Sequence, residues 1–157
     1  TEGASTNVVA RMVMHRLMTM VRTGDNFGPY PVDPLATPIL ESDFVEFQTK
    51  NDPIADTSTF VKIERRAQTD PERGPFELWY IQTQYSAGAL QTTEARPLIT
   101  GVLEAKFTLE YDVGPRLRRA TVDLTIRPNS FQAASIGIDF ETPTIRLVSS
   151  VVPRRLD

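Results

Sequence analysis

Hydrophobic and polar residues alternate along much of this chain with the period of two that is typical of β-strands. The clearest case is residues 103–112, whose predicted inward-facing members are Leu103, Ala105, Phe107, Leu109 and Tyr111. Residues 119–127 repeat the pattern, with Ala120, Val122, Leu124 and Ile126 facing inward. Because residues 113–116 offer a turn between them, the two segments predict an antiparallel hairpin with one solvated face.

Shorter alternating segments predict further strands at 45–47, 59–67, 76–85, 136–140 and 144–152. A helical segment precedes all of them in the chain. One helix followed by six or seven strands predicts an α+β fold, in which the helix is laid on an antiparallel sheet. The length of 157 residues fits a single domain over 1–157 with one hydrophobic core.

The predicted helix covers residues 8–23 and has an unusually wide apolar side. A helical wheel places these residues in one half: Val9, Ala10, Val13, Met14, Leu17, Met18, Met20 and Val21. An apolar arc of about 180° exceeds the stripe of about 100° that a single packing surface requires. The helix is therefore expected to pack against two surfaces. Gly24 directly after it predicts a left-handed helix stop.

Residues 25–38 interrupt the periodic segments with four prolines and one glycine. Proline removes a backbone donor and fixes φ, so this composition excludes a regular helix and disfavours a central strand. The segment is predicted to be a long loop stiffened by its prolines.

Composition narrows the classes of function. A net charge of −3 and a pI near 5.2 give no overall basic field for nonspecific binding to nucleic acid or to an anionic membrane. The absence of cysteine excludes disulfides, thiolate zinc sites and cysteine nucleophiles. No apolar stretch of the sequence given is long enough to span a bilayer.

Candidates for catalysis or metal binding are few. His15 is the only histidine, and its helical neighbours Arg11 and Thr19 supply neither an orienting carboxylate nor a second ligand. The acidic loops 51–56 and 69–75 could collect calcium, but both lack the ligand order of an EF-hand. A turn built on Asp-Pro explains them better. We therefore expect no enzyme activity, no catalytic or metal-binding residue and no cofactor, with calcium in an acidic loop as the alternative.

Basic residues offer one alternative. Arg116, Arg118 and Arg119 lie beside the predicted hairpin turn, and further arginines are Arg65, Arg66, Arg154 and Arg155. Together with Trp79, Tyr80 and Tyr85 they could contact nucleic acid through phosphate binding and base stacking. Charges at hairpin ends also prevent edge-to-edge aggregation, so this contact stays an alternative.

Several of these segments together resemble a known family. They are the helix RMVMHRLMTMVRTG, the strands SDFVEFQ and TFVKIERRAQ, and the pair PLITGVLEAKFTLEYD and RRATVDLTIR. They resemble the type IV pilin-like proteins, most closely the J-type minor pseudopilins of bacterial type II secretion and the W-type minor pilins. The matching strand positions are Leu98, Gly101, Val102, Phe107 and Tyr111. The ending LVSSVVPRRLD is similar to the closing strand and basic tail of that family.

The resemblance implies a pilin-like fold and a role in assembly. It implies the periplasmic domain of a bacterial protein anchored in the inner membrane, with a membrane-spanning half of the helix preceding Thr1. The implied partners are I-type and K-type minor pseudopilins and the major pseudopilin, at the tip of a secretion pseudopilus. The helix residues expected at the partner interface are Val9, Met14, Met18 and Val21.

Two other functions stay open at this point. One is a minor type IV pilin involved in pilus assembly or DNA uptake, which would use Arg116, Arg118 and Arg119. The other is an unrelated extracytoplasmic β-rich domain that binds a ligand, which would require a deep pocket with perturbed titrating groups.

Overall fold

The computed structural model describes residues 2–33, 35–68, 75–112, 116–127 and 144–154, with side chains from residue 8 onward. Within these ranges one helix, α1 (Glu2–Thr23), precedes eight strands of one antiparallel sheet. The strands are β1 (Asp25–Gly28), β2 (Ile39–Ser42), β3 (Phe44–Asp52), β4 (Thr57–Ala67), β5 (Phe76–Ser86), β6 (Ala89–Asp112), β7 (Arg116–Ile126) and β8 (Ile145–Val151). Their spatial order is β1-β3-β4-β5-β6-β7-β8, and β2 pairs with β6 outside that path.

This architecture corrects the predicted fold class. Strands hold 67% of the residues whose side chains the structure describes, and the helix holds 13%. The fold is therefore mostly β, with eight strands, and the prediction of a pilin-like α+β fold with six or seven strands is wrong.

The strands that the sequence did not predict explain this difference. β1 and β2 are only four residues long each and lie at the two ends of the proline-rich segment, too short to show a period. Residues 89–97 of β6 are exposed throughout, because both faces of this part meet solvent. Without a buried face there is no alternation for sequence analysis to detect.

The predicted hairpin is confirmed as the pair β6–β7, with Phe107 opposite Val122 and Ala105 opposite Leu124. The residues expected to face inward on β7 are all buried. The predicted strand 136–140 and residues 113–115 of the predicted turn 113–116 lie outside the described residues, and Arg116 is the first residue of β7.

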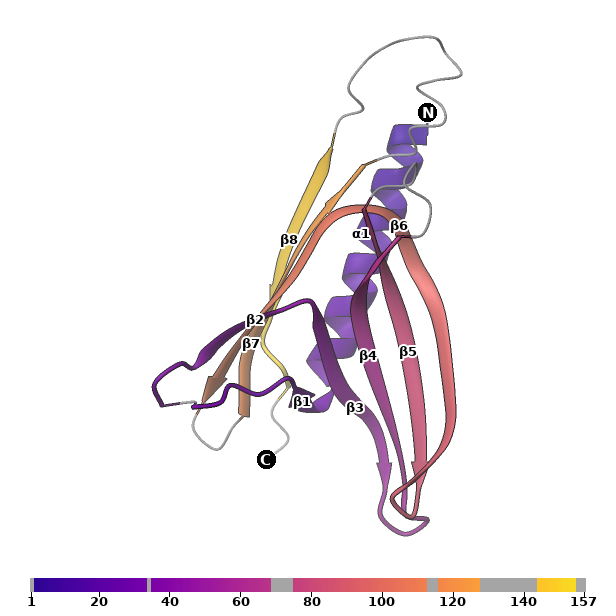
Figure 1. The fold of residues 1–157 in the computed structure, drawn as a ribbon, viewed down its shortest axis with the longest axis vertical. Coiled ribbons are helices and arrows are strands. Elements are labelled where there is room, and N and C mark those ends of the chain that lie inside the picture. The colour runs from indigo at the N-terminus through magenta and orange to yellow at the C-terminus, as the bar shows by residue number, and fades with distance from the viewer. Residues whose placement is uncertain (1, 34, 69–74, 113–115, 128–143, 155–157) are drawn as a thin grey trace.

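Strand β6 bends and divides the sheet into two wings (Figure 1). The long wing consists of β3, β4, β5 and the first part of β6, which pairs with β5 from Ala89 to Val102. The short wing consists of β7, β8, β2 and the second part of β6, which pairs with β7 from Val102 to Asp112. At the junction Gly101 has a φ of +72°, and its carbonyl accepts a 2.8 Å hydrogen bond from the Arg127 N–H.

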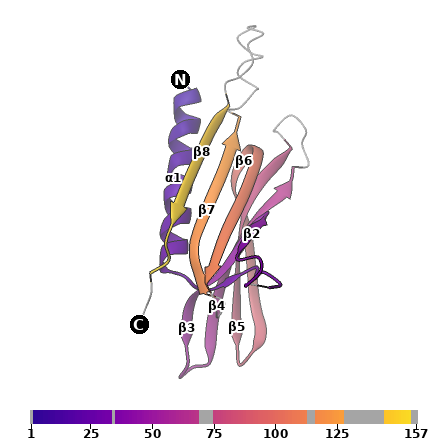
Figure 2. The same cartoon turned by 90° about the vertical axis from the view of Figure 1, so that its left-hand side faces the viewer.

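Helix α1 lies between the wings and supplies one side of the core (Figures 1 and 2). Its buried stripe is Ala10, Met14, Leu17 and Val21, and Val13, Met18 and Met20 pack on the same core at its flanks. Each fully buried large apolar side chain stabilises the fold by about 1.5–3 kcal/mol. The sheet therefore holds the helix along this one stripe.

The helix ends against the sheet at Gly24, for a reason other than the predicted one. Gly24 is not among the residues with positive φ, so the prediction of a left-handed stop is wrong. A Cβ at this position would lie 2.7 Å from Cδ2 of Phe47. Glycine is required here by the close approach of the backbone to a buried ring.

The bend predicts a stability difference between two substitutions at Gly101. An alanine in the left-handed region costs about 1–2 kcal/mol, whereas asparagine tolerates that region better. We expect Gly101→Ala to lower the free energy of unfolding by about 1–2 kcal/mol and Gly101→Asn to lower it by less. Urea denaturation with an unchanged m value measures both. Equal losses for the two variants would show that backbone conformation is not the cause.

Candidate interaction surface

The four helix residues predicted to meet a partner have different environments in the structure. Met14 is 6% exposed and Val21 is fully buried, so both belong to the core of the chain itself. Met18 is half-buried at the flank of that core, and Val9 is 48% exposed. Of the predicted set, only Val9 and part of Met18 are accessible to a partner.

Other apolar helix residues are exposed beside Val9. Val8 is 56% exposed and Met12 is 65% exposed. Sequence analysis missed both, because they fall in the polar half of the helical wheel. The signal that could have found them is the presence of large apolar side chains on that side of an amphipathic helix. Together with Val9 they form an apolar helix surface that the sheet does not cover.

The described side chains of the helix include several basic residues. Between Val8 and Thr23 the helix carries Arg11, His15, Arg16 and Arg22, and it carries no carboxylate. His15 is exposed, and its carbonyl accepts a 3.0 Å hydrogen bond from the Thr19 hydroxyl. From Val8 to Thr23 the helix therefore presents exposed apolar side chains among basic ones.

The arginines predicted to contact nucleic acid lie at the start of β7. Because Glu110 faces Arg119 while Tyr111 faces Leu117, Arg118 is the extra residue of a β-bulge. The bulge exposes Arg118 and Arg119 in succession, and Arg116 is exposed as well. Acidic residues accompany them: Glu110 Oε2 lies 3.6 Å from Arg119 Nε, and Asp112 faces Arg116.

The remaining arginines do not join these three. Arg65 stacks over the Phe76 ring at 4.3 Å, and Arg66 stacks over Trp79 at 4.7 Å. Both lie on β4, which β5 and β6 separate from β7 in the sheet. Arg154 is tied to the end of α1, where its N–H donates to the Arg22 carbonyl at 2.7 Å. Arg155 lies outside the described residues. The predicted basic stripe is therefore not assembled among the arginines described.

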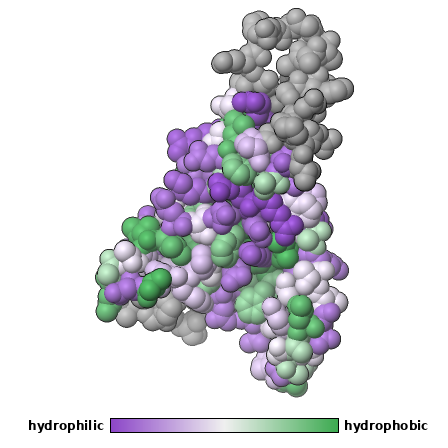
Figure 3. Space-filling model, viewed as in Figure 1, coloured by the Kyte–Doolittle hydropathy of each residue, from purple (hydrophilic) through white to green (hydrophobic). Residues whose placement is uncertain are grey.

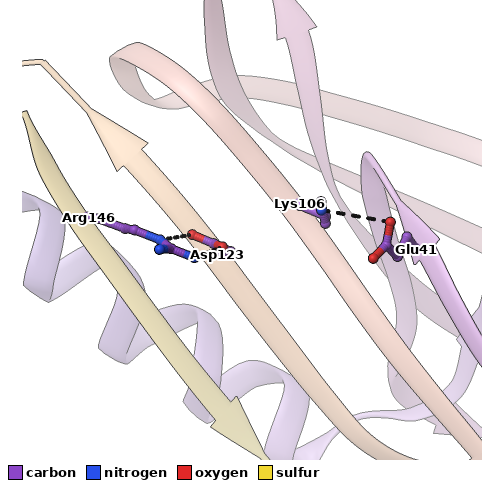
Figure 4. A network of polar contacts seen from close by, with 4 residues as sticks. All are labelled: Glu41, Lys106, Asp123 and Arg146. Atoms are coloured by element: carbon purple, nitrogen blue, oxygen red, sulfur yellow. Dashed lines mark hydrogen bonds and ion pairs between the residues drawn. The ribbon is translucent and has the colours of Figure 1, made fainter.

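The outer face of the short wing is joined by cross-strand ion pairs (Figure 4). Arg146 on β8 donates to both carboxylate oxygens of Asp123 on β7, at 3.0 and 2.7 Å. These hydrogen bonds lower the pKa of Asp123 below its ordinary value. Lys106 Nζ lies 3.7 Å from Glu41 Oε2 and joins β6 to β2. Exposed pairs of this kind add little to stability and mainly keep the face polar.

A loop at the C-terminal end of α1 is held in place by Tyr111. The Tyr111 hydroxyl donates to the Pro29 carbonyl at 2.6 Å, and the Tyr111 N–H donates to the Pro38 carbonyl at 2.8 Å. The Tyr111 ring is 4% exposed and lies 5.8 Å from the Tyr30 ring. Burial, reinforced by Tyr30 and Glu46, raises the pKa of Tyr111 above its ordinary value. One residue therefore holds both ends of the loop, the Pro29 end through its hydroxyl and the Pro38 end through its backbone N–H.

Sites for chemistry are few in the residues described. No group of three or more histidine, aspartate or glutamate side chains there could hold a metal ion. In the acidic loop 51–56, Asp52 Oδ1 accepts the N–H groups of Ile54 and Ala55, at 3.0 and 3.2 Å. This carboxylate caps a turn, as the Asp-Pro interpretation predicted, and residues 69–74 of the second acidic loop lie outside the description. Within the same residues, no helix has the length and hydrophobicity to cross a bilayer.

The loop geometry predicts the behaviour of Tyr111→Phe. The substitution leaves the Pro29 carbonyl without its donor, so we expect the free energy of unfolding to fall by about 0.5–1.5 kcal/mol near neutral pH. Tyr30→Phe is the matched control, because Tyr30 is 51% exposed and surface changes stay within about 0.5 kcal/mol. Thermal or urea unfolding of both variants measures the difference, and equal stability would contradict the role of the hydroxyl.

The raised pKa of Tyr111 also predicts a dependence on alkaline pH. The unfolded tyrosine ionises near its ordinary value of about 10, whereas the folded one keeps its proton to higher pH. The folded state then binds more protons than the unfolded state, so stability falls as pH rises above that value. We expect the wild type to lose more stability than Tyr111→Phe between pH 8 and pH 10.5, measured by urea unfolding. Parallel losses would contradict it.

Comparisons with known proteins give this chain no relative. No family model, no curated protein and no solved structure matches it.

Proposed function

We propose that this chain is a non-enzymatic assembly subunit, a minor pseudopilin of a type II secretion pseudopilus. Its helix packs on its own sheet along one stripe and on the helices of neighbouring subunits along another. The partners are I-type and K-type minor pseudopilins and the major pseudopilin. The described chain is then the periplasmic domain of a protein anchored in the inner membrane by the helix segment that precedes Thr1.

The observation that carries the proposal is the uncovered apolar surface of α1. Val8, Val9 and Met12 are each about half exposed or more, although they lie on a helix whose other side is buried in the core. Large apolar side chains that remain exposed next to a core commonly mark a protein interface. Methionine suits such a surface because its flexible side chain accepts more than one packing partner.

The fold class does not support the proposal, because the fold is mostly β with eight strands and is not the pilin-like α+β fold that the sequence predicts. The support comes from the helix surface and from the sequence resemblance of α1, β6 and β7. Head-to-tail assembly in a fibre requires two different surfaces on each subunit. The uncovered apolar side of α1 supplies one such surface, while its buried side packs on the chain's own sheet.

A direct test is the mass and N-terminal residue of the protein isolated from its own membranes. We expect an N-methylated aromatic residue, followed by an apolar stretch that continues into Thr1 as one helix. A native chain that begins with an ordinary cleaved signal peptide, or that lacks such an apolar stretch, would contradict the proposal.

A pair of helix substitutions tests the interface itself. Val9→Glu with Met12→Glu places carboxylates on the uncovered surface, so we expect recovery of co-purified I-type and K-type subunits to fall at least tenfold. Folding should change little, because substitutions of exposed residues stay within about 0.5 kcal/mol each. The matched control is Leu90→Glu with Val148→Glu, since these side chains are 60% and 56% exposed on strands. Equal recovery by both double variants would exclude the helix surface.

A further inference from the structure

A second group of exposed apolar side chains lies at the other end of α1. It belongs to the segment between β1 and β2 and to the start of β2, and Figure 3 shows hydrophobic surface gathered over this part of the molecule. Tyr30 is 51%, Val32 104%, Leu35 79% and Ile39 55% exposed. Four large apolar residues in one short segment exceed the scattered exposure that is normal for a soluble surface. We call these four residues the loop cluster.

The loop cluster is held in a fixed conformation. Asp33 Oδ1 accepts the N–H groups of Leu35 and Ala36, at 3.1 and 3.3 Å, and the Thr37 N–H donates to the Asp33 carbonyl at 2.8 Å. Tyr111 secures the ends at Pro29 and Pro38. A rigid loop loses little conformational entropy on binding, so its exposed side chains can act as ready anchors.

Three arginines lie next to the loop cluster. Ile39 faces Glu110 across the β2–β6 pair, and Glu110 faces Arg119 across the β6–β7 pair. These three residues therefore share one face of the sheet in a row. The bulge exposes Arg118 beside Arg119. Arg116, which is also exposed, lies two positions before Arg118 in the strand. Protein-binding surfaces commonly combine large apolar side chains, which anchor the partner, with arginines beside them.

We propose that the loop cluster and Arg116, Arg118 and Arg119 form a docking surface for a second protein. The matching surface of that partner has an apolar groove, with carboxylates at its rim opposite the three arginines and basic groups opposite Glu110 and Asp112. The inference goes beyond the assembly role, because it concerns the opposite end of α1 and does not depend on the helix surface.

The local charges favour a protein over other partners. Glu110 and Asp112 lie among the three arginines, and Glu41 and Asp33 belong to the same end of the molecule. A phosphate backbone or an anionic membrane presents one sign of charge and would be repelled by these carboxylates. A protein rim can place opposite charges against both signs, which gives specificity as well as affinity.

The test uses a random dodecapeptide library displayed on phage and selected on the full chain. We expect enrichment of peptides that combine apolar anchors with flanking Asp or Glu. Their affinity should fall at least tenfold for Val32→Ser with Leu35→Ser, and at least threefold for Arg118→Glu. The matched control is Ile54→Ser with Leu90→Ser, whose side chains are 97% and 60% exposed on other loops and strand ends. This control should bind like the wild type.

Several results would overturn the proposal. Peptides without a common pattern, or peptides that bind the loop variants and the wild type equally, would exclude this surface. Binding of a 20-base-pair DNA duplex or of phosphatidylglycerol vesicles that is lost in the same variants would assign it to nucleic acid or lipid instead. Sedimentation that shows a dimer abolished by Val32→Ser with Leu35→Ser would make a second copy the occupant.

Discussion

The pairing of β6 with three other strands is the constraint on which the rest of the structure depends. This one strand pairs with β5 along its first part, with β7 along its second part, and with β2 at residues 107–110. It belongs to both wings, and the bend at Gly101 lies where the two wings meet. Helix α1 packs its buried stripe on the core between the wings. Helix position, loop position and the exposed end of β7 all follow from this strand.

The two uncovered apolar surfaces have a common physical origin. The sheet covers α1 along the stripe of Ala10, Met14, Leu17 and Val21 and at its flanks, so the apolar residues on the opposite half of the helix, Val8 and Met12, stay in solvent. At the other end, Pro29, Pro31 and Pro38 lack the backbone N–H that a strand of the sheet would use. The apolar side chains of this loop then stay exposed around Tyr111. Both surfaces arise from constraints on the backbone, and both leave large apolar groups where a partner can reach them.

Much of the fold could be predicted from the sequence, and the rest depended on features without a local signal. The helix and the β6–β7 hairpin were predicted because each has one face fully buried and therefore a clear period. The first part of β6 was missed because polar residues such as Thr92 and Glu94 meet solvent on both faces. At the candidate site, Val9 was predicted, whereas Val8, Met12 and the loop cluster were missed. Conversely, the sequence analysis assigned Met14 and Val21 to a partner interface, although both belong to the core. An apolar arc on a helix does not show which of its residues the sheet of the same chain covers.

The backbone hydrogen bond between Arg154 and Arg22 has a mechanical consequence. It ties the chain after β8 to the last turn of α1, and the helix lies along β8 through most of its length (Figure 2). Tension applied along the helix axis passes through the covalent chain into β1, and this hydrogen bond gives it a second route into the segment after β8, parallel to the β7–β8 ladder. A load in this direction stresses all hydrogen bonds of a ladder together, whereas a load across the strands opens them one after another. The sheet is thus oriented to resist pulling along α1.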